Sequence, residues 1–419
     1  MGTVNTSEIA DVAVIGAGII GTTIAERLQH EGKRVLLIDR QAPGLGCSQG
    51  NAGHFASDVI LPLANFNTLL GVPKMLLDPL GPLSIKWSYF PQLVPWLMRY
   101  TWAAMPHKTR QSVDALKVLN RPSIARFKDL LKRTSLEYLM TQKGALTVYH
   151  SAAAANKNRQ HAQFVSRHGV NVEQLNGDEV RELEPAVAAA ITGGLYYPDT
   201  AHTINPYQLV ASLADYFMSA GGQFVQQEVM AIQTMASTHV VLKTKGADIV
   251  AKEVVIAGGA WSKALAKMVG HTIPLETERG YHLMLPTPKV ELTRPVTSFE
   301  RSFVMTPMQE GLRLAGTVEL AGLNAPENEQ RAKILLNHAK EVLPQVDGSE
   351  GKSWMGHRPS LPDSLPIIGR SPKHERVLFA FGHQHLGLTQ AAVTADLISE
   401  AVLRKPHQVD ITPFRVDRF

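Results

Sequence analysis

The sequence predicts an α/β fold in which a nucleotide-binding domain, assembled from distant segments, carries an inserted α+β domain built on a mixed sheet. Two observations predict it. Residues 11–40 show a strand, a Gly-x-Gly-x-x-Gly turn, an amphipathic helix and a second strand that ends on an acid. One such unit cannot make a sheet alone, so its partner strands must come from distant parts of the chain, and the strand pattern that begins at Val254 can pack beside the first strand.

The glycine turn has a physical role at each position. Gly16 permits a tight turn, Gly18 lets the backbone approach a pyrophosphate, and Gly21 lets the helix and strand pack closely. The helix N-terminus faces the phosphate charge. Asp39 lies in the distance range where a carboxylate accepts a hydrogen bond from a ribose hydroxyl. The motif therefore predicts a Rossmann-type dinucleotide site, without naming the dinucleotide or the chemistry.

Composition limits the class of protein and its partners. With 419 residues, 44% of them hydrophobic and 19% charged, the chain is long enough for two domains. The net charge of +5 comes without a Lys/Arg-rich run, so no nucleic acid is expected as a partner. Cys47 is the only cysteine, which excludes an internal disulfide and a cysteine-based metal site. No signal peptide or bilayer-length apolar run is found, so a cytoplasmic location is expected.

Residues 59–106 are unusually rich in proline and in aromatic side chains, including Trp87, Trp96 and Trp102. The prolines forbid one long helix, so short helices broken by turns are expected. Two interpretations stay open. The segment is either a packed helical subdomain that covers the active site or an apolar surface that dips into a membrane interface.

Two loops carry further candidate binding residues. Residues 47–54 (CSQGNAGH) are small enough for close backbone approach to a phosphate or ring system, although an ordinary loop would look similar. His54 in this loop either faces substrate or forms a structural hydrogen bond. Residues 254–262 (VVIAGGAWS) run from a strand into a Gly-Gly turn and a helix, which can bring backbone close to a cofactor.

The C-terminal part of the chain holds the candidate reaction end. At 381–389 a strand feeds a Gly-bracketed loop into a helix N-terminus, which makes an electropositive cradle. A flavin needs such a cradle because negative charge builds on its ring when hydride arrives. Arg358, beside the rigid Pro359, suits a bidentate clamp on a carboxylate, and the alternative is a surface ion pair.

Taken together, these motifs resemble the D-amino-acid oxidase superfamily of FAD enzymes, and within it the bacterial D-amino-acid dehydrogenases of small-subunit type. The likeness rests on the fingerprint, the Asn-Ala-Gly loop, the Gly-x-Arg-Pro segment and the Gly-His-x-x-x-Gly loop, in order over nearly the whole chain. It implies FAD as the cofactor. The expected domains are an FAD-binding domain of residues 1–58, 203–273 and 353–419, and a substrate domain of residues 59–202 and 274–352 that includes the helical subdomain 59–106.

The resemblance also implies residue roles. Arg358 would clamp the substrate carboxylate, Tyr281 would lie in a strand that crosses the substrate pocket, and His54 and His383 would lie near the ring. Three of these four, Arg358, Tyr281 and His54, are the expected catalytic residues. The residues expected to bind FAD are Gly16, Gly18, Ile19, Ile20, Gly21, Asp39, Arg40, Ser48, Asn51, Ala52, Gly53, Val229, Gly258, Trp261, Gly356, Gly382, His383, Leu386, Gly387, Leu388 and Thr389.

The reaction that the resemblance implies is oxidation of a D-amino acid by hydride transfer from Cα to flavin N5. The imine then gives a 2-oxo acid, or stays as a cyclic imine. Electrons would pass to a quinone-type acceptor, with the protein peripheral on the cytoplasmic face of the inner membrane. Departures from the family pattern at Arg279 and 384–385 favour substrates such as D-proline or cis-4-hydroxy-D-proline. Alternatives are a glycine- or sarcosine-type amine oxidase using oxygen, an NAD-dependent dehydrogenase and a non-catalytic flavin-binding protein.

Overall fold

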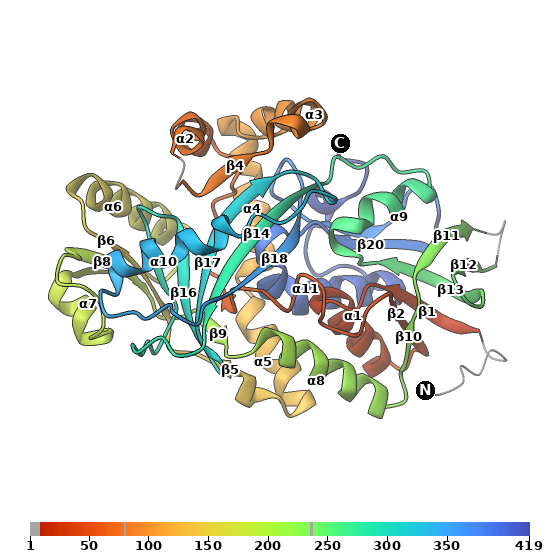
Figure 1. Cartoon of the computed structure of the whole chain (residues 1–419). Coiled ribbons are helices and arrows are strands. Elements are labelled where there is room, and N and C mark those ends of the chain that lie inside the picture. Colours follow the sequence, from red (N-terminus) through yellow and green to blue (C-terminus); the bar gives the residue numbers. More distant parts are fainter. Residues whose placement is uncertain (1–8, 79–80, 235–237) are drawn as a thin grey trace.

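A computed structural model describes residues 9–78, 81–234 and 238–419 (Figure 1). Two large β-sheets organise these residues. The strands of the first sheet lie on the right of Figure 1, and those of the second lie in the centre and on the left. This arrangement confirms the predicted fold class, in which distant segments build one sheet and an inserted part builds another.

The first sheet contains the fingerprint. Its parallel strands, in spatial order, are β10 (Gln223–Gln226), β2 (Val35–Asp39), β1 (Ala10–Ile15), β13 (Ile249–Ile256) and β20 (Val377–Phe381). The first half of β13 pairs with antiparallel β12 (Val240–Thr244), which pairs with β11 (Val229–Thr234), and β20 also pairs with β19 (Ile367–Arg370). The partners of the fingerprint strands therefore come from distant parts of the chain, and β13 lies beside β1, as predicted.

Helices cover both faces of this sheet, which explains why its central strands are apolar throughout. On one face α1 (Ile19–His30) packs against α11 (Gly387–Val402) and α8 (Pro206–Ser219), around side chains such as Val14 and Leu28. On the other face α9 (Ser262–Met268) packs on residues such as Ile15 and Val254.

The second sheet carries the strands that the cofactor segments do not supply. Its order is β18 (Lys352–Ser360), β14 (Glu276–Leu285), β17 (Gly311–Leu320), β16 (Phe303–Met308), β15 (Val296–Ser298), β6 (Ala145–Tyr149), β8 (Gly193–Tyr197) and β7 (Glu173–Asn176). All neighbours are antiparallel except β15 and β6. Sequence analysis placed residues 353–360 with the FAD-binding segments, whereas β18 pairs with β14 along its whole length. The rest of the domain division stays a prediction.

Shorter elements connect the two sheets. A small sheet joins β3 (His54–Phe55), β9 (Ala201–Thr203) and β5 (Met140–Thr141). The helices α4 (Pro106–Asn120) and α5 (Ser123–Thr134) lead from the first part to the second, and α10 (Gln330–Val342) lies on the second sheet (Figure 1).

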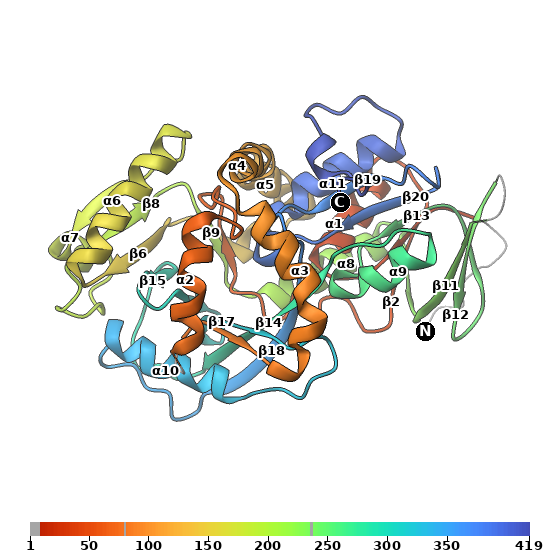
Figure 2. The same ribbon diagram turned by 90° about the horizontal axis from the view of Figure 1, so that it is seen from above.

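Residues 63–103 form an outlying layer, which we call the arm. It consists of α2 (Phe66–Leu77), β4 (Leu83–Ile85), η1 (Trp87–Tyr89) and α3 (Phe90–Ala103), apart from residues 79–80, which the structure does not describe. The predicted short helices are thus present, and two of them contain a proline, Pro73 and Pro95. In Figures 1 and 2 the arm lies above the sheets.

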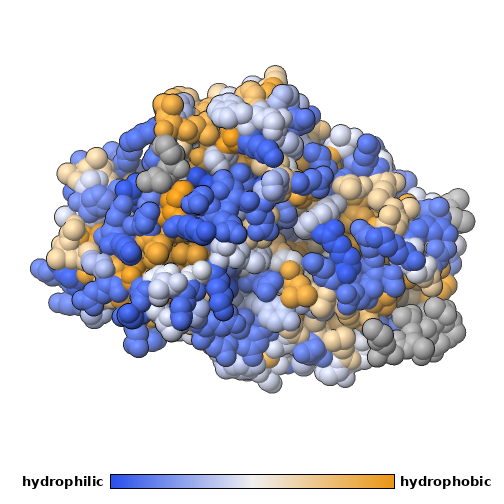
Figure 3. All heavy atoms as spheres, in the orientation of Figure 1, coloured by the Kyte–Doolittle hydropathy of each residue, from blue (hydrophilic) through white to orange (hydrophobic). Residues whose placement is uncertain are grey.

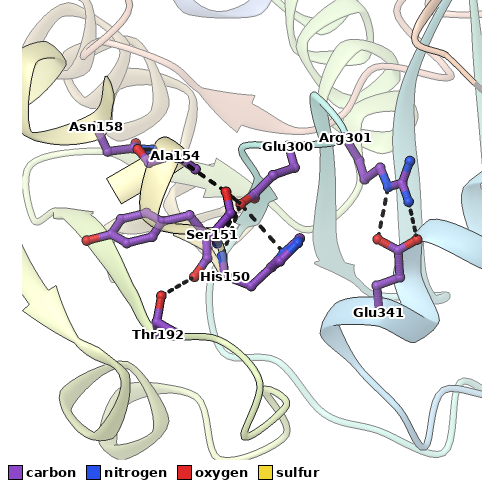
Figure 4. A network of polar contacts seen from close by, with 9 residues as sticks. His150, Ser151, Ala154, Asn158, Thr192, Glu300, Arg301 and Glu341 are labelled. Atoms are coloured by element: carbon purple, nitrogen blue, oxygen red, sulfur yellow. Dashed lines mark hydrogen bonds and ion pairs between the residues drawn. The ribbon is translucent and has the colours of Figure 1, made fainter. Parts of the chain in front are cut away.

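At the outer end of the second sheet, polar contacts fix the helices (Figure 4). The Glu300 carboxylate accepts hydrogen bonds from the backbone N–H groups of His150 (3.1 Å) and Ser151 (3.2 Å), at the start of α6 (Ala152–Arg167). Arg301 forms a two-pronged ion pair with Glu341 of α10, at 2.9 and 2.6 Å. These contacts hold the scaffold and lie away from the cavity described next.

Candidate active site

A cavity of about 360 Å³ opens at the carboxyl ends of the parallel strands. The last residues of β1, β2 and β20, Ile15, Asp39 and Phe381, line it together with Ala257, which follows β13. In open α/β sheets ligands bind in the crevice beyond these strand ends. The position therefore agrees with a nucleotide site.

The fingerprint end of the cavity is built for close approach to an anion. Gly16 has a φ of +111°, and a Cβ there would lie 2.4 Å from the Ala257 carbonyl oxygen, so only glycine fits. The Ala17 N–H donates to Asp39 Oδ2 (2.7 Å), and the Ile19 N–H donates to Ser48 Oγ (2.9 Å). The N-cap residue of α1, Gly18, supplies no side-chain cap, and the first turn has no acid, so apart from the Ile19 N–H this helix end is open to a phosphate.

Aromatic and cationic side chains form the next wall. The Arg40 guanidinium lies 4.1 Å from the centroid of the Trp261 ring, and Trp261 meets His357 edge-on at 5.5 Å. Val229 of β11 lines the same region. His357 was not among the predicted residues, although it lies next to Arg358 in β18.

Most of the predicted FAD-binding residues line this one cavity. They are Gly16, Gly18, Ile19, Ile20, Asp39, Arg40, Ser48, Asn51, Val229, Gly258, Trp261, Gly382, His383, Gly387 and Leu388. The others, Gly21, Ala52, Gly53, Gly356, Leu386 and Thr389, lie outside its lining. Gly21 packs on Gly16, because a Cβ there would meet the Gly16 carbonyl oxygen at 1.8 Å. Thr389 Oγ1 accepts a hydrogen bond from the Ala56 N–H at 3.0 Å.

Arg358 lies on the face of the second sheet that meets loop 47–54. It stands opposite Glu278 in the pairing of β18 with β14, and its guanidinium lies over Gly280, where a Cβ would come within 2.4 Å of Cζ. Burial raises the pKa of Glu278, against the charge of Arg358 and a hydrogen bond with Ser360. Within the described ranges no carboxylate forms an ion pair with Arg358, so its donors are available to a ligand.

Two histidines lie within electrostatic range of this arginine or of each other. Burial lowers the pKa of His54 to about 4, and its Nε2 is buried without a partner. The pKa of His385 is also lowered to about 4, first by burial and then by the charges of Arg358 and His54. Both imidazoles are therefore neutral at physiological pH. His383 differs: its Nε2 meets Thr394 Oγ1 at 3.0 Å, so its side chain is bound to α11.

Tyr281 lies on the opposite face of β14 from Arg358. Side chains alternate along a strand, so the residues opposite Met355 and Trp354 face different sides. The Tyr281 hydroxyl donates to Glu319 Oε2 (2.6 Å) and accepts from the Asn328 N–H (3.1 Å). The structure therefore does not bring this predicted catalytic residue together with Arg358.

Sequence reasoning missed a group of residues that attach loop 47–54 to the second sheet. His282 stacks on Trp354 with ring centroids 5.0 Å apart, and its Nδ1 lies 3.1 Å from the Gly50 carbonyl oxygen. Arg313 donates to the carbonyl oxygens of Gln49 (3.2 Å) and Asn51 (2.6 Å). One sequence signal could have found Trp354. Trp354, Gly356 and Arg358 are alternate residues of one strand, so Trp354 is expected on the same face as Arg358.

Comparisons with known proteins agree with this geometry. The family model described as DAO, FAD dependent oxidoreductase, matches residues 11–401. A D-amino-acid oxidase of Bradyrhizobium diazoefficiens is 34% identical over 97% of this chain and 98% of its own length. The chain therefore belongs to the DAO family of FAD-dependent oxidoreductases, which confirms FAD as the cofactor and the predicted enzyme class.

Other relatives share the whole length. A D-amino acid dehydrogenase of Vibrio atlanticus is 29% identical over 98% of this chain and 100% of its own length. The crystal structure of glycine oxidase from Geobacillus kaustophilus superposes with a TM-score of 0.75 and 25% identity, covering 99% of this chain and 100% of that one. The fold is thus shared across several amine- and amino-acid-oxidising proteins.

Proposed function

We propose that the protein is an FAD-dependent D-amino-acid dehydrogenase whose cofactor occupies the cavity beyond the first sheet. The single observation that carries the proposal is Arg358, a cation that faces the cofactor loop and forms no ion pair with any residue the structure describes. A guanidinium with free donors matches the planar geometry of a carboxylate. The full-length relatives named as D-amino-acid oxidase and dehydrogenase support the substrate class.

The residues of the cavity suit FAD. The open N-terminus of α1 and the backbone at Gly16 and Gly18 would hold the pyrophosphate, and Asp39 would hold the adenosine ribose. The backbone from Gly382 to Leu388, at the start of α11, would hold the flavin. When bound, FAD accepts the two electrons released by oxidation of the substrate C–N bond.

Arg358 would bind the substrate carboxylate and thereby orient Cα. His385 lies within electrostatic range of Arg358, and His54 lies within range of His385, so these two neutral imidazoles would add hydrogen-bonding groups without placing a second charge near the amine. The substrate enters as the free amine, loses its Cα hydrogen with two electrons, and leaves as a protonated imine that water converts to a 2-oxo acid and ammonium. Correct orientation supplies much of the rate in such a reaction, so no strong side-chain base is needed.

For the particular substrate we propose a cyclic D-amino acid of the D-proline or cis-4-hydroxy-D-proline type. The loop at 384–385 supports this choice, because Gln384 adopts a left-handed φ of +51° and its Nε2 donates to the Leu361 carbonyl oxygen at 3.1 Å. This conformation sets His385 beside Arg358, where the sequence departs from the family pattern. A cyclic substrate would leave as a cyclic imine.

Anaerobic bleaching of the flavin band tests the substrate. The panel consists of D- and L-proline, both hydroxy-D-prolines, D-alanine, L-alanine, glycine and sarcosine. We expect D-amino acids to bleach the band, with the cyclic ones fastest. Bleaching by glycine and sarcosine alone would replace the proposal with the amine-oxidase alternative, and a protein that no substrate bleaches would indicate a non-catalytic flavoprotein.

For the electron acceptor we propose a membrane quinone, reached through contact of the arm with the bilayer interface on the cytoplasmic face. Exposed apolar side chains on the arm, including Leu77 and Trp87, support this. In the described part of the chain no helix is both long and apolar enough to cross a bilayer. Turnover with a ubiquinone analogue in vesicles should exceed peroxide formation in air, and the reverse would favour an oxygen-using oxidase.

A further inference from the structure

A second cavity, of about 590 Å³, lies beside the cofactor cavity and shares Ala260, Trp261 and Ala264 with it. The base of the arm, helix α9, the start of β14 and the loop that follows β17 enclose it. Its lining includes Lys86, Ser88, Tyr89, Lys263, Lys267 and Glu276. Nothing in the reaction above uses this cavity.

Three lysines dominate the charge of this cavity. Lys263 and Lys267 lie one turn apart on the exposed side of α9, and Lys86 approaches from the arm. None of the three forms an ion pair with another described residue. Their positive charge is therefore available to an anion.

The nearby carboxylates are already engaged or face another groove. Glu276 in the cavity wall accepts from the Tyr89 hydroxyl (2.9 Å) and from the Thr277 N–H (2.8 Å). In the neighbouring groove, which Lys86 also lines, Glu329 pairs with Lys333 at 3.0 Å, while Glu327 is exposed. Glu276 is the one carboxylate among the described residues of the lining, and the three lysines outnumber it, so the cavity has a net positive charge.

One exposed apolar side chain of the arm, Trp87, stands at the edge of this cavity, and others lie elsewhere on the arm. Trp87, 70% exposed, adjoins both Lys86 and Ser88 of the cavity wall, and Leu77 and Trp102 are 83% and 63% exposed. Figure 3 shows hydrophobic side chains gathered at the top of the molecule, over α2 and α3. In the view from above, α3 and α9 lie on the same side of the molecule (Figure 2). Such a surface suits a bilayer, because the cationic cavity would face the lipid phosphates while the exposed apolar side chains of the arm would reach the acyl chains.

We propose that this cavity binds the phosphate headgroup of an anionic phospholipid. Lys86, Lys263 and Lys267 would contact the phosphate while Trp87 and the arm enter the acyl boundary. The proposal rests on the membrane contact proposed above and adds a specific site for the lipid charge. It predicts that the surface binds anionic bilayers in preference to neutral ones.

Vesicle co-sedimentation of the FAD-loaded enzyme tests the site. Vesicles of phosphatidylcholine are compared with vesicles that also contain about 30% phosphatidylglycerol, which gives the bilayer a negative surface potential. The wild type should bind the anionic vesicles more tightly, and Lys263→Glu/Lys267→Glu should lower that affinity about tenfold or more. Lys128→Glu/Lys132→Glu is the matched control, because it makes the same charge change one turn apart on α5, also at exposed positions.

Each outcome supports or overturns the site. Equal losses in the two double variants would show general charge attraction, and wild-type binding by Lys263→Glu/Lys267→Glu would remove the cavity from membrane binding. Trp87→Ser should weaken binding to both kinds of vesicle, so loss of the arm contact is distinguishable from loss of the headgroup site. If inorganic phosphate raises the Tm of the wild type alone while vesicles do not bind, the site takes a soluble anion and the headgroup proposal fails. Turnover with a soluble dye should be unchanged in all three variants.

Discussion

Two arginines on adjacent strands of the second sheet occupy opposite faces and contrast in every contact. Arg279 is fully buried and its two terminal nitrogens are held by the protein: it pairs with Glu319 at 2.8 Å and donates to the carbonyl oxygens of Pro326 (2.9 Å) and Ala325 (2.9 Å). Arg358 lies over Gly280 and forms no ion pair among the described residues. The two guanidiniums have the same chemistry but different surroundings.

The difference teaches how to read a buried arginine. A buried cation that is paired with a carboxylate contributes to folding, since its removal leaves that carboxylate unpaired in a low-dielectric interior. A cation left without a partner near a cofactor cavity contributes little to folding and is available to a ligand. The following substitutions separate these two roles, from the largest expected effect to the smallest.

Replacement of Arg279 should have the largest effect on stability. In Arg279→Ala the buried Glu319 loses its counter-ion, so the free energy of unfolding should fall by about 3–5 kcal/mol. Urea unfolding measures this change. Arg279→Lys, which keeps the charge, should recover part of the loss. A fully stable Arg279→Ala protein would show that the pair is dispensable for folding.

Replacement of Arg358 should instead affect the reaction. We expect Arg358→Ala to lower kcat/KM for a D-amino acid about 100-fold, from the loss of charge-assisted hydrogen bonds worth about 3 kcal/mol. The free energy of unfolding and the FAD content should stay close to those of the wild type. Unchanged kcat/KM in a flavin-loaded variant would refute the clamp.

The Arg358 face also contains His282, which burial keeps neutral by lowering its pKa to about 3. An unfolded histidine titrates near pH 6.5, so as the pH falls below that value the unfolded state takes the proton first and stability is lost. At pH 5 this cost is about 2 kcal/mol for a group held neutral. His282→Phe avoids the cost, so its stability deficit at pH 8 should shrink by about that amount at pH 5. Equal deficits at both pH values would contradict the pKa shift.

The smallest effect is expected at Tyr281, on the Arg279 face. Tyr281→Phe removes one hydrogen bond to Glu319 and one from Asn328, with an expected loss of about 1 kcal/mol of stability. kcat/KM should change by less than about twofold if the residue is remote from the substrate. A loss comparable with that in Arg358→Ala would restore Tyr281 to the catalytic site.

Local sequence patterns predicted the first sheet and its glycine turn better than the residues around Arg358 on the second sheet. The reason is physical. The roles of Gly16, Gly18 and Asp39 follow from neighbouring residues, and the parallel strands follow from apolar runs. The face on which Tyr281 lies depends instead on strand pairing, and the pairing of β14 with β17 shifts register between Tyr281 and His282. Such a bulge leaves no local sequence signal.

The side chains that hold loop 47–54 against the second sheet could not be predicted from the sequence either. His282 and Arg313 come from strands more than two hundred residues away, and their partners are backbone carbonyl groups, which carry no side-chain signature. The composition of the loop indicated close backbone approach, but not the group that holds it. Proline likewise predicted where the arm would be interrupted, yet α2 and α3 continue through Pro73 and Pro95.

The division of β13 between two neighbours has a consequence for how the protein matures. Its first half pairs with β12, which is close along the chain. Its second half pairs with β20, which begins only at Val377. During synthesis the edge at Val254–Ile256 stays bare until nearly the entire chain has left the ribosome. Capture of FAD is therefore a late event, and a nascent chain released before residue 381 would expose an unpaired apolar strand edge that is prone to aggregate.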